Sequence, residues 1–268
     1  MMERLQMAQY GIQMFPTKLS IISQPPAQSA SYSLSFDGTD DYIDLRDDPS
    51  GEATFPAALP IGNAARTISA WIRPADITST GFRQIFGYGN IATHHAFFFI
   101  HKDDTIMMSS YSQYVATSSS CLSLNTWHHV VVTYDGGNPG TVKLYENADE
   151  VGDGTVNDPY VLNTYVGNVT PNIGRNGNND GEVFNGNIDE VGVWDVALDA
   201  DAITTIYGSG TPIDLTSDDG NYDNSDNLIG YWKFNEGSGT SAGETTGTTN
   251  IFDGTISGAA YDTEVPPN

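Results

Sequence analysis

Hydrophobic and polar residues alternate with the period of a β-strand along most of the chain after residue 30. The alternation is clear at 32–36 and 67–73, and 188–194 is another segment of strand length. Residues 96–100 form an apolar run of strand length. Residues 127–134 form a second, nearly continuous run, which is typical of a central strand buried on both faces. Turn residues separate the segments, as in the Gly-rich stretch at 135–140. The pattern therefore predicts many short antiparallel strands.

A single helical pattern follows the strand at 188–194. Asp199 is a suitable N-cap and Gly208 suits the C-terminal end. The apolar residues between them fall on one helix face: Ala202, Ile203, Ile206 and Tyr207. Many short strands with one two-turn helix indicate an all-β, two-sheet antiparallel sandwich. Residues 211–262 are too few and too polar for a separate core, so we expect them to complete the same sandwich.

Composition narrows the classes of partner. The chain has 268 residues and a net charge of −24, from 34 acidic and 10 basic side chains. Nucleic acid is excluded as a partner because phosphate binding requires a basic surface. No apolar run reaches transmembrane length, so we expect no membrane insertion. The acidity is explained either by solubility or adaptation to salty surroundings, or by carboxylates that bind divalent cations.

Residues 1–30 differ from the rest and are interpreted as an N-terminal arm. They hold four of the six methionines and end in a Pro-containing, linker-like stretch at 24–29. We expect the arm to bind other subunits of an assembly, with residues 31–268 forming one domain. The first residues lack the apolar segment of a secretory leader, so ordinary secretion is not expected.

Acidic residues in two places suggest a calcium site. Asp37, Asp40 and Asp41 lie in a tight Gly-containing loop that can offer carboxylate and backbone oxygens together. Asp189, from a distant strand, could complete the site. At the strand period of two, Asp189 shares a face with Val191 and Val193, where a carboxylate needs donors or a cation. The alternative is that the loop aspartates only cap their own turn.

Glycan binding requires aromatic faces and a few amide or charged partners. The polar stretch around 111–114 and the loop at 175–180 supply such residues: Tyr111, Tyr114, Arg175, Asn176 and Asn178. The four tryptophans, in contrast, lie within strand segments and are expected in the core.

Five segments, taken in order, resemble the concanavalin A-like lectin/glucanase superfamily in its laminin G-like, pentraxin-like branch, which occurs in bacterial surface and phage virion proteins. They are SLSFDGTDDYI at 33–43, TISAWI at 67–72, WHHVV at 127–131, GNIDEV at 186–191 and GYWKFNEGSG at 230–239. The resemblance implies a jelly-roll sandwich that binds glycans or proteins without catalysis, often with structural calcium. One departure is the hairpin turn at 147–149, where the family usually has Asn-Gly.

Catalysis is not expected. Glucanase relatives carry Glu-x-Asp-x-Glu on one strand, whereas here Asp189 and Glu190 are adjacent and position 192 is glycine. His129 matches the Trp-x-His position of the family and is expected in the core. No Ser-His-Asp, zinc or phosphate-loop signature is present.

The sequence therefore predicts a non-catalytic lectin-like adhesion protein, displayed on the surface of a virion as a capsid decoration or tail attachment. The first alternative is a free or secreted extracellular carbohydrate-binding module. The second, less favoured, is a relative of the glycoside hydrolases.

Overall fold

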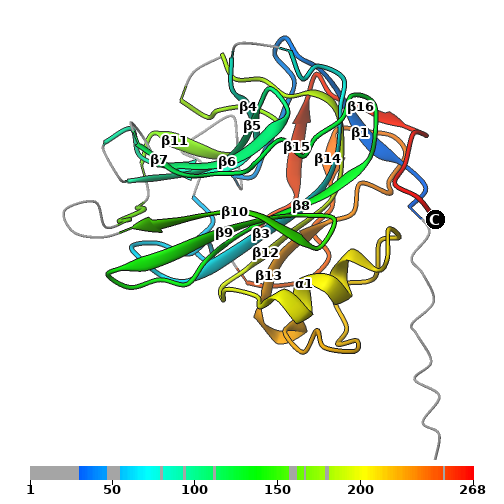
Figure 1. Ribbon diagram of the computed structural model, residues 1–268. Helices are drawn as coiled ribbons and strands as arrows, with labels where there is room; N and C mark the ends of the chain where they lie inside the picture. The colour runs from blue at the N-terminus through cyan, green and yellow to red at the C-terminus, as the bar shows by residue number, and fades with distance from the viewer. Residues whose placement is uncertain are drawn as a thin grey trace, which may run out of the picture.

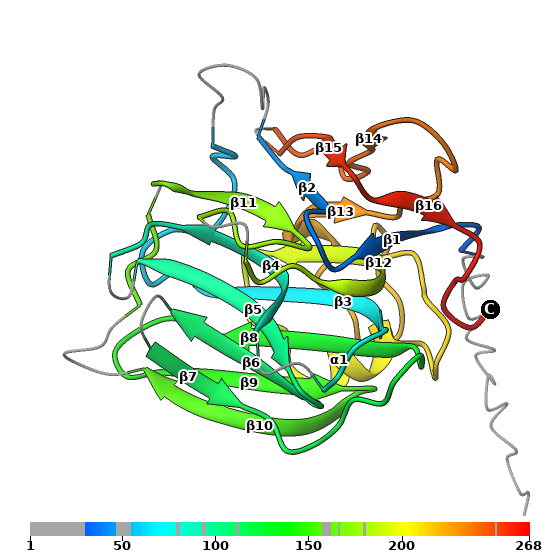
Figure 2. The ribbon, with the colours of Figure 1, turned by 90° about the horizontal axis from the view of Figure 1, so that it is seen from above.

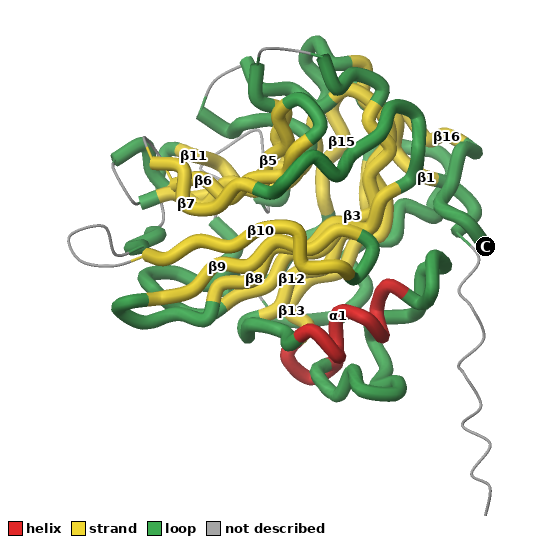
Figure 3. Tube along the Cα trace, viewed as in Figure 1, coloured by secondary structure: helices red, strands yellow, loops and turns green. Residues whose placement is uncertain are grey.

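The structure is a computed structural model that describes residues 30–46, 55–78, 81–92, 95–110, 113–156, 162–165, 167–178, 181–249 and 251–268. Two antiparallel sheets pack face to face, and one α-helix lies beneath the first sheet (Figures 1 and 3). This arrangement confirms the predicted all-β jelly-roll sandwich. The arm at 1–29 lies outside the described residues.

The first sheet carries the helix. Across the sheet, its strands are β10 (Asp149–Val156), β9 (Gly140–Glu146), β8 (His128–Tyr134), β3 (Arg66–Pro74), β12 (Asn185–Trp194), β1 (Ser33–Asp37) and β16 (Ala260–Asp262). β13 (Leu228–Trp232) pairs with the second half of β12. Every residue of β8 is buried, as the apolar run at 127–134 predicts for a central strand.

The second sheet faces away from the helix. Its strands, in order, are β14 (Ser241–Ala242), β15 (Gly254–Ser257), β2 (Tyr42–Asp44), β11 (Val169–Ile173), β4 (Arg83–Gly89), β5 (Ala96–Lys102), β6 (Thr105–Ser110) and β7 (Gln113–Thr117). The C-terminal segment thus adds strands to both sheets.

Three apolar clusters hold these layers together. The largest lies between the sheets and includes Phe36, Phe86 and Trp232. A second cluster joins the outer face of the first sheet to α1 (Ala200–Tyr207), and a third lies on the outer face of the second sheet. A short 3-10 helix, η1 (Ser225–Asn227), precedes β13. None of the helices in the described part of the chain has the length and apolar character needed to span a bilayer.

The helix forms as the sequence predicts. The Asp199 side chain accepts a hydrogen bond from the backbone N–H of Ala202, and Gly208 ends the helix in the left-handed conformation. Ala202, Ile203 and Ile206 are buried against the first sheet. Because an eight-residue helix is unstable alone, this packing is what maintains it.

A β-bulge in β12 changes the alternation that the sequence predicts. The register shifts between Asp189 and Gly192, and Glu190 has a positive φ of 50°. Ile188 and Val191, three positions apart, consequently both belong to the core between the sheets. Asp189 lies opposite Trp71, which stacks on Tyr207 of α1. The prediction that Asp189 shares a face with Val191 and Val193 is therefore wrong. The extra residue of the bulge places Asp189 on the opposite face of the sheet from these two valines.

Candidate functional site

The outer face of the second sheet carries a continuous row of residues, one from each of six strands. Successive registers pair Tyr114 with Ser109, Ser109 with Phe98, Phe98 with Gly87, Gly87 with Asn172, and Asn172 with Asp44. Directly paired residues share a face, so all six lie on one side of the sheet. Figure 2 looks onto this face, and no helix among the described residues crosses it.

Glycine at position 87 makes room for an amide in the middle of the row. A Cβ at Gly87 would lie 2.1 Å from Nε2 of Gln84, so the Gln84 side chain occupies this place. Gln84 and Asn172 are buried, and neither the Gln84 carboxamide nor Nδ2 of Asn172 has a hydrogen-bond partner among the described residues. Such groups favour a polar partner, because a buried donor or acceptor without one destabilises the protein.

One end of the row is aromatic. The Tyr114 side chain is 63% exposed, and its ring centroid lies 5.5 Å from that of Phe82. The ammonium group of Lys102 lies 5.3 Å from the centroid of the Phe82 ring on the same face. Phe98, in the row itself, is almost buried. This end offers an exposed ring beside a cation, a combination that suits contact with the C–H surface of a sugar.

The other end of the row is polar and charged. The Arg175 guanidinium stacks 3.5 Å from the centroid of the Tyr42 ring, and Asp44 pairs with Arg46 at 2.5 Å. In the loop after β11, Asn176 Nδ2 donates to Glu182 at 2.6 Å. Thr170 Oγ1 contacts both Asn172 and Gly177, so this loop folds back over β11.

The structure places the predicted glycan-binding residues at separate points on this face. Tyr111 lies outside the described residues. Tyr114 lies four strands from Asn172, about 19 Å at the usual strand spacing of ~4.8 Å. Arg175 and Asn176 lie in the loop that follows β11, and Asn178 donates its backbone N–H to Asn176. These residues therefore do not form one compact pocket.

Sequence reasoning missed Phe98, Ser109 and Asn172 in the middle of the row, and Gln84, whose side chain lies against Gly87. The apolar run at 96–100 hides the outward direction of Phe98, since its neighbours Phe97 and Phe99 face the core between the sheets. Only the pairing register brings these residues together.

The three loop aspartates do lie together. One carboxylate oxygen from each of Asp37, Asp40 and Asp41 lies within 4.8 Å of the others. Asp37 Oδ1 accepts from the Thr39 N–H at 2.7 Å, and Asp41 Oδ2 accepts from the Asp37 N–H at 2.8 Å, so two of them also cap the turn. Burial, with the charges of Asp37 and Asp40, raises the pKa of Asp41. The oxygen donors suit a hard cation such as calcium.

Asp189 does not belong to that group. It lies in the β12 bulge and is fully buried, and its Oδ1 accepts from the Glu190 N–H at 3.0 Å. Oδ2 has no hydrogen-bond partner among the described residues. Burial, with the neighbouring negative charges of Glu190 and Glu236, raises the pKa of Asp189 well above its usual value.

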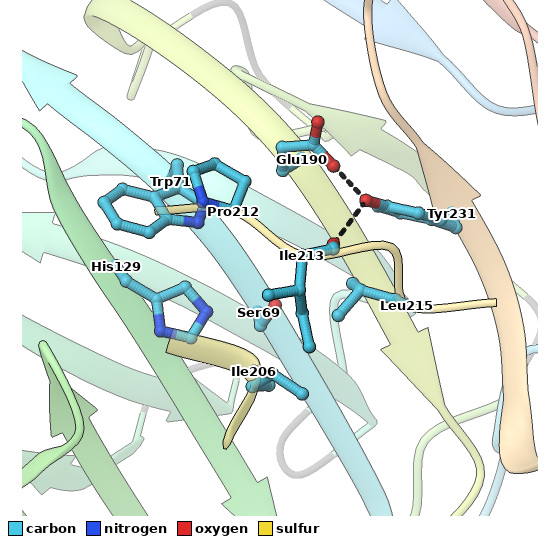
Figure 4. A pocket seen from close by; sticks show the side chains of 9 residues that line it. All are labelled: Ser69, Trp71, His129, Glu190, Ile206, Pro212, Ile213, Leu215 and Tyr231. Carbon is cyan, nitrogen blue, oxygen red and sulfur yellow. Dashed lines mark hydrogen bonds between the residues drawn. The ribbon is translucent and has the colours of Figure 1, made fainter. Parts of the chain in front are cut away.

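A second polar cluster lies between the first sheet and α1 (Figure 4). Tyr231 donates a short hydrogen bond to Glu190, and its hydroxyl also lies 3.4 Å from the Ile213 carbonyl oxygen. His129 is buried, as predicted, and burial lowers its pKa to about 3. Ser69, His129 and Glu190 are residue types of a hydrolase triad. However, no hydrogen bond joins Ser69 to His129 in the described structure, and their cavity of about 10 Å³ has no room for a substrate.

Comparisons with known proteins agree with this architecture. The sequence profile of the concanavalin A-like lectin/glucanases superfamily matches residues 37–204. No curated protein matches the chain by sequence. Among solved structures, a suspected carbohydrate binding protein from Bacteroides ovatus is similar, with a TM-score of 0.62 and 19% identity over 90% of this chain. This chain spans 62% of the length of that protein.

A sialidase module from Ruminococcus gnavus, CBM40 bound to α2,3-sialyllactose, is also similar. Its TM-score is 0.50 at 15% identity, and the match covers 66% of this chain and 96% of the module. At these identities, the two structures support the fold and leave the binding residues to be argued from the site itself.

Proposed function

This chain belongs to the concanavalin A-like lectin/glucanase superfamily, and from that premise we propose that it binds glycans without catalysis through the outer face of its second sheet. The row from Tyr114 to Asp44 is the observation that carries the proposal. It combines the exposed aromatic ring of Tyr114 and an apolar centre at Phe98 with two buried amides. Among the described residues, the Gln84 carboxamide and Nδ2 of Asn172 have no hydrogen-bond partner. Sugar hydroxyls both donate and accept, so they suit such amides.

We place the binding surface on the second sheet because the outer face of the first sheet is covered. α1 packs on the outer face of the first sheet, with Ile213, Leu215 and Tyr222 in the same apolar cluster. That cover occupies the centre of the first sheet. The second sheet has no helix of the described chain over it, and the exposed Tyr114 lies there.

The length of the row favours an oligosaccharide over a single sugar. Tyr114 and Asn172 are about 19 Å apart by strand spacing. A ligand that contacts the aromatic end and the amides together must therefore be extended. Because the Ruminococcus module was solved with sialyllactose, sialylated oligosaccharides belong in the first ligand panel beside neutral ones.

The absence of catalysis is supported by the arrangement of acidic residues. In the described residues of β12, Asp189 and Glu190 face buried surroundings, and Glu190 is engaged by Tyr231. A retaining glycosidase needs two carboxyl groups about 5 Å apart on the substrate side. On the proposed face, Asp44 is paired with Arg46 and Glu182 accepts from Asn176.

A glycan array followed by titration calorimetry tests the proposal. We expect saturable binding of an oligosaccharide, and roughly tenfold weaker binding in Tyr114→Ala, because the variant loses one stacking contact. Tyr165→Ala is the matched control, since Tyr165 is 41% exposed and lies beside His95, beyond the far end of β4. Equal binding by both variants, or no binding to any glycan, would refute the proposal.

Calcium and attachment to a virion are separate proposals. We propose that Asp37, Asp40 and Asp41 bind calcium, supported by their three converging carboxylates.

Display on a virion, with a secreted module as its alternative, is the setting that the family branch suggests. The backbone of Ala30, the first described residue, exchanges hydrogen bonds with the Asn268 side chain. Co-purification of the chain with particles, lost when 1–29 is deleted, tests this setting.

A further inference from the structure

A small cavity lies between the outer face of the first sheet and the segment that covers it (Figure 4). Its volume is about 10 Å³. Side chains of the sheet line one side, and residues of α1 and the segment after it line the other: Ser69, Trp71, His129, Glu190, Tyr231, then Ile206, Pro212, Ile213 and Leu215. All nine residues are buried.

Two polar atoms of the lining residues have no hydrogen-bond partner in the described structure. They are Oγ of Ser69 and Nδ1 of His129. A buried hydroxyl or ring nitrogen left in this state destabilises the fold, and most such atoms in native proteins have a protein or water partner. The orphan atoms belong to neighbouring strands, because Trp71 of β3 pairs with His129 of β8 and Ser69 lies two positions along β3.

The register explains why the two residues do not bond directly. Diagonal neighbours two positions apart in a sheet are separated by about 7–8 Å between backbones, too far for short side chains to meet easily. A water molecule bridges polar groups at such separations. It needs about 10–15 Å³ of space and two to four polar partners. The cavity offers that space, together with Ser69, His129 and the Glu190–Tyr231 pair.

We propose that this cavity binds one internal water molecule, held by Oγ of Ser69 and Nδ1 of His129, which bridges β3 and β8 beneath α1. The site is separate from the proposed glycan surface, which lies on the other sheet. Its volume restricts the ligand to water, and Ile206, Ile213 and Leu215 form the apolar wall on the side of the covering segment. The bound water thus completes the polar contacts under the helix.

Two measurements on the full chain test the proposal. Water-to-protein nuclear Overhauser spectroscopy should show cross-peaks from a long-lived water to protons of Ser69 and His129. Ser69→Ala should lower the urea midpoint of unfolding more than the control Ser35→Ala, whose serine lies in β1 of the same sheet and is only half-buried. The larger loss is expected because the water loses one of its partners.

The same two measurements can also overturn the proposal. If the cavity is dry, Ser69→Ala removes an unpartnered hydroxyl and should raise the midpoint. A raised midpoint, or the lack of any water cross-peak to the two residues in the unmodified protein, would overturn the proposal. The spectroscopic test does not depend on the variant, so it holds even if Ser69→Ala folds poorly.

Discussion

Replacing Asp189 by Asn should stabilise the protein at neutral pH. Asp189 is fully buried, and its Oδ2 has no hydrogen-bond partner among the described residues. The ionisable groups that act on it, Glu190 and Glu236, are both acidic and oppose its ionisation. Asn keeps the Oδ1 acceptor for the Glu190 N–H and removes a carboxyl group whose ionisation is disfavoured by burial in the folded protein but not in the unfolded chain.

Proton linkage gives the sign and the size of the difference in unfolding free energy between the unmodified protein and Asp189→Asn. Asp189 has a raised pKa in the folded protein, against 3.8 as its ordinary value. Its contribution to stability is therefore complete below pH 3.8 and is lost as the pH rises through the folded pKa. Within that window, the free energy of unfolding should fall by up to about 1.4 kcal/mol per pH unit relative to Asp189→Asn.

Urea unfolding followed by tryptophan fluorescence between pH 4 and pH 8 measures this difference. Subtracting the Asp189→Asn curve cancels the titration of the many other acidic groups. Asp153→Asn, at an exposed position of β10, is the control and should show no such trend. If the difference between the unmodified protein and Asp189→Asn does not change with pH, the reasoning about this buried carboxyl group is refuted.

Three further variants test local features. Ala148→Gly should stabilise the protein by about 0.5–1 kcal/mol in thermal unfolding. Ala148 has a φ of 73° in the β9–β10 turn, and glycine adopts this conformation without strain. A loss of stability in this variant would contradict the prediction. Asp199→Ala should cost about 1 kcal/mol by removing the cap of α1, whereas the exposed Asp201→Ala should cost clearly less; equal losses would show that the cap is not responsible. Calcium should raise the unfolding midpoint, and Asp40→Asn should abolish this rise. The substitution should not weaken the turn, because the hydrogen bonds of the turn go to Asp37 and Asp41. If calcium does not change the midpoint, the aspartates only cap their turn.

The elements that the sequence predicts well are those fixed by local chemistry. The caps of α1 at Asp199 and Gly208 and the buried strand at 128–134 follow from short patterns. The turn at 147–148 adopts positive φ at both residues, the conformation of a two-residue hairpin turn, although Ala148 replaces the usual glycine. Strand pairing imposes this conformation whatever the preference of the residue.

Features that depend on register could not be predicted in the same way. The bulge at Asp189 adds one residue to β12 and reverses the face of everything before it. The candidate glycan surface joins six strands whose pairing has no local signature, so Gln84 and Asn172 gave no signal in the sequence. Tyr114 was identified because an aromatic residue in a polar stretch is a local feature.

The central claim is that glycans bind the outer face of the second sheet. Backbone amide shifts of the full protein, recorded while a bound oligosaccharide is titrated, test it most directly. The account predicts shift changes that grow with ligand at Phe98, Ser109, Tyr114 and Asn172, with little change around α1. Changes confined to the first sheet, or to the loop from Asp37 to Asp41, would contradict it.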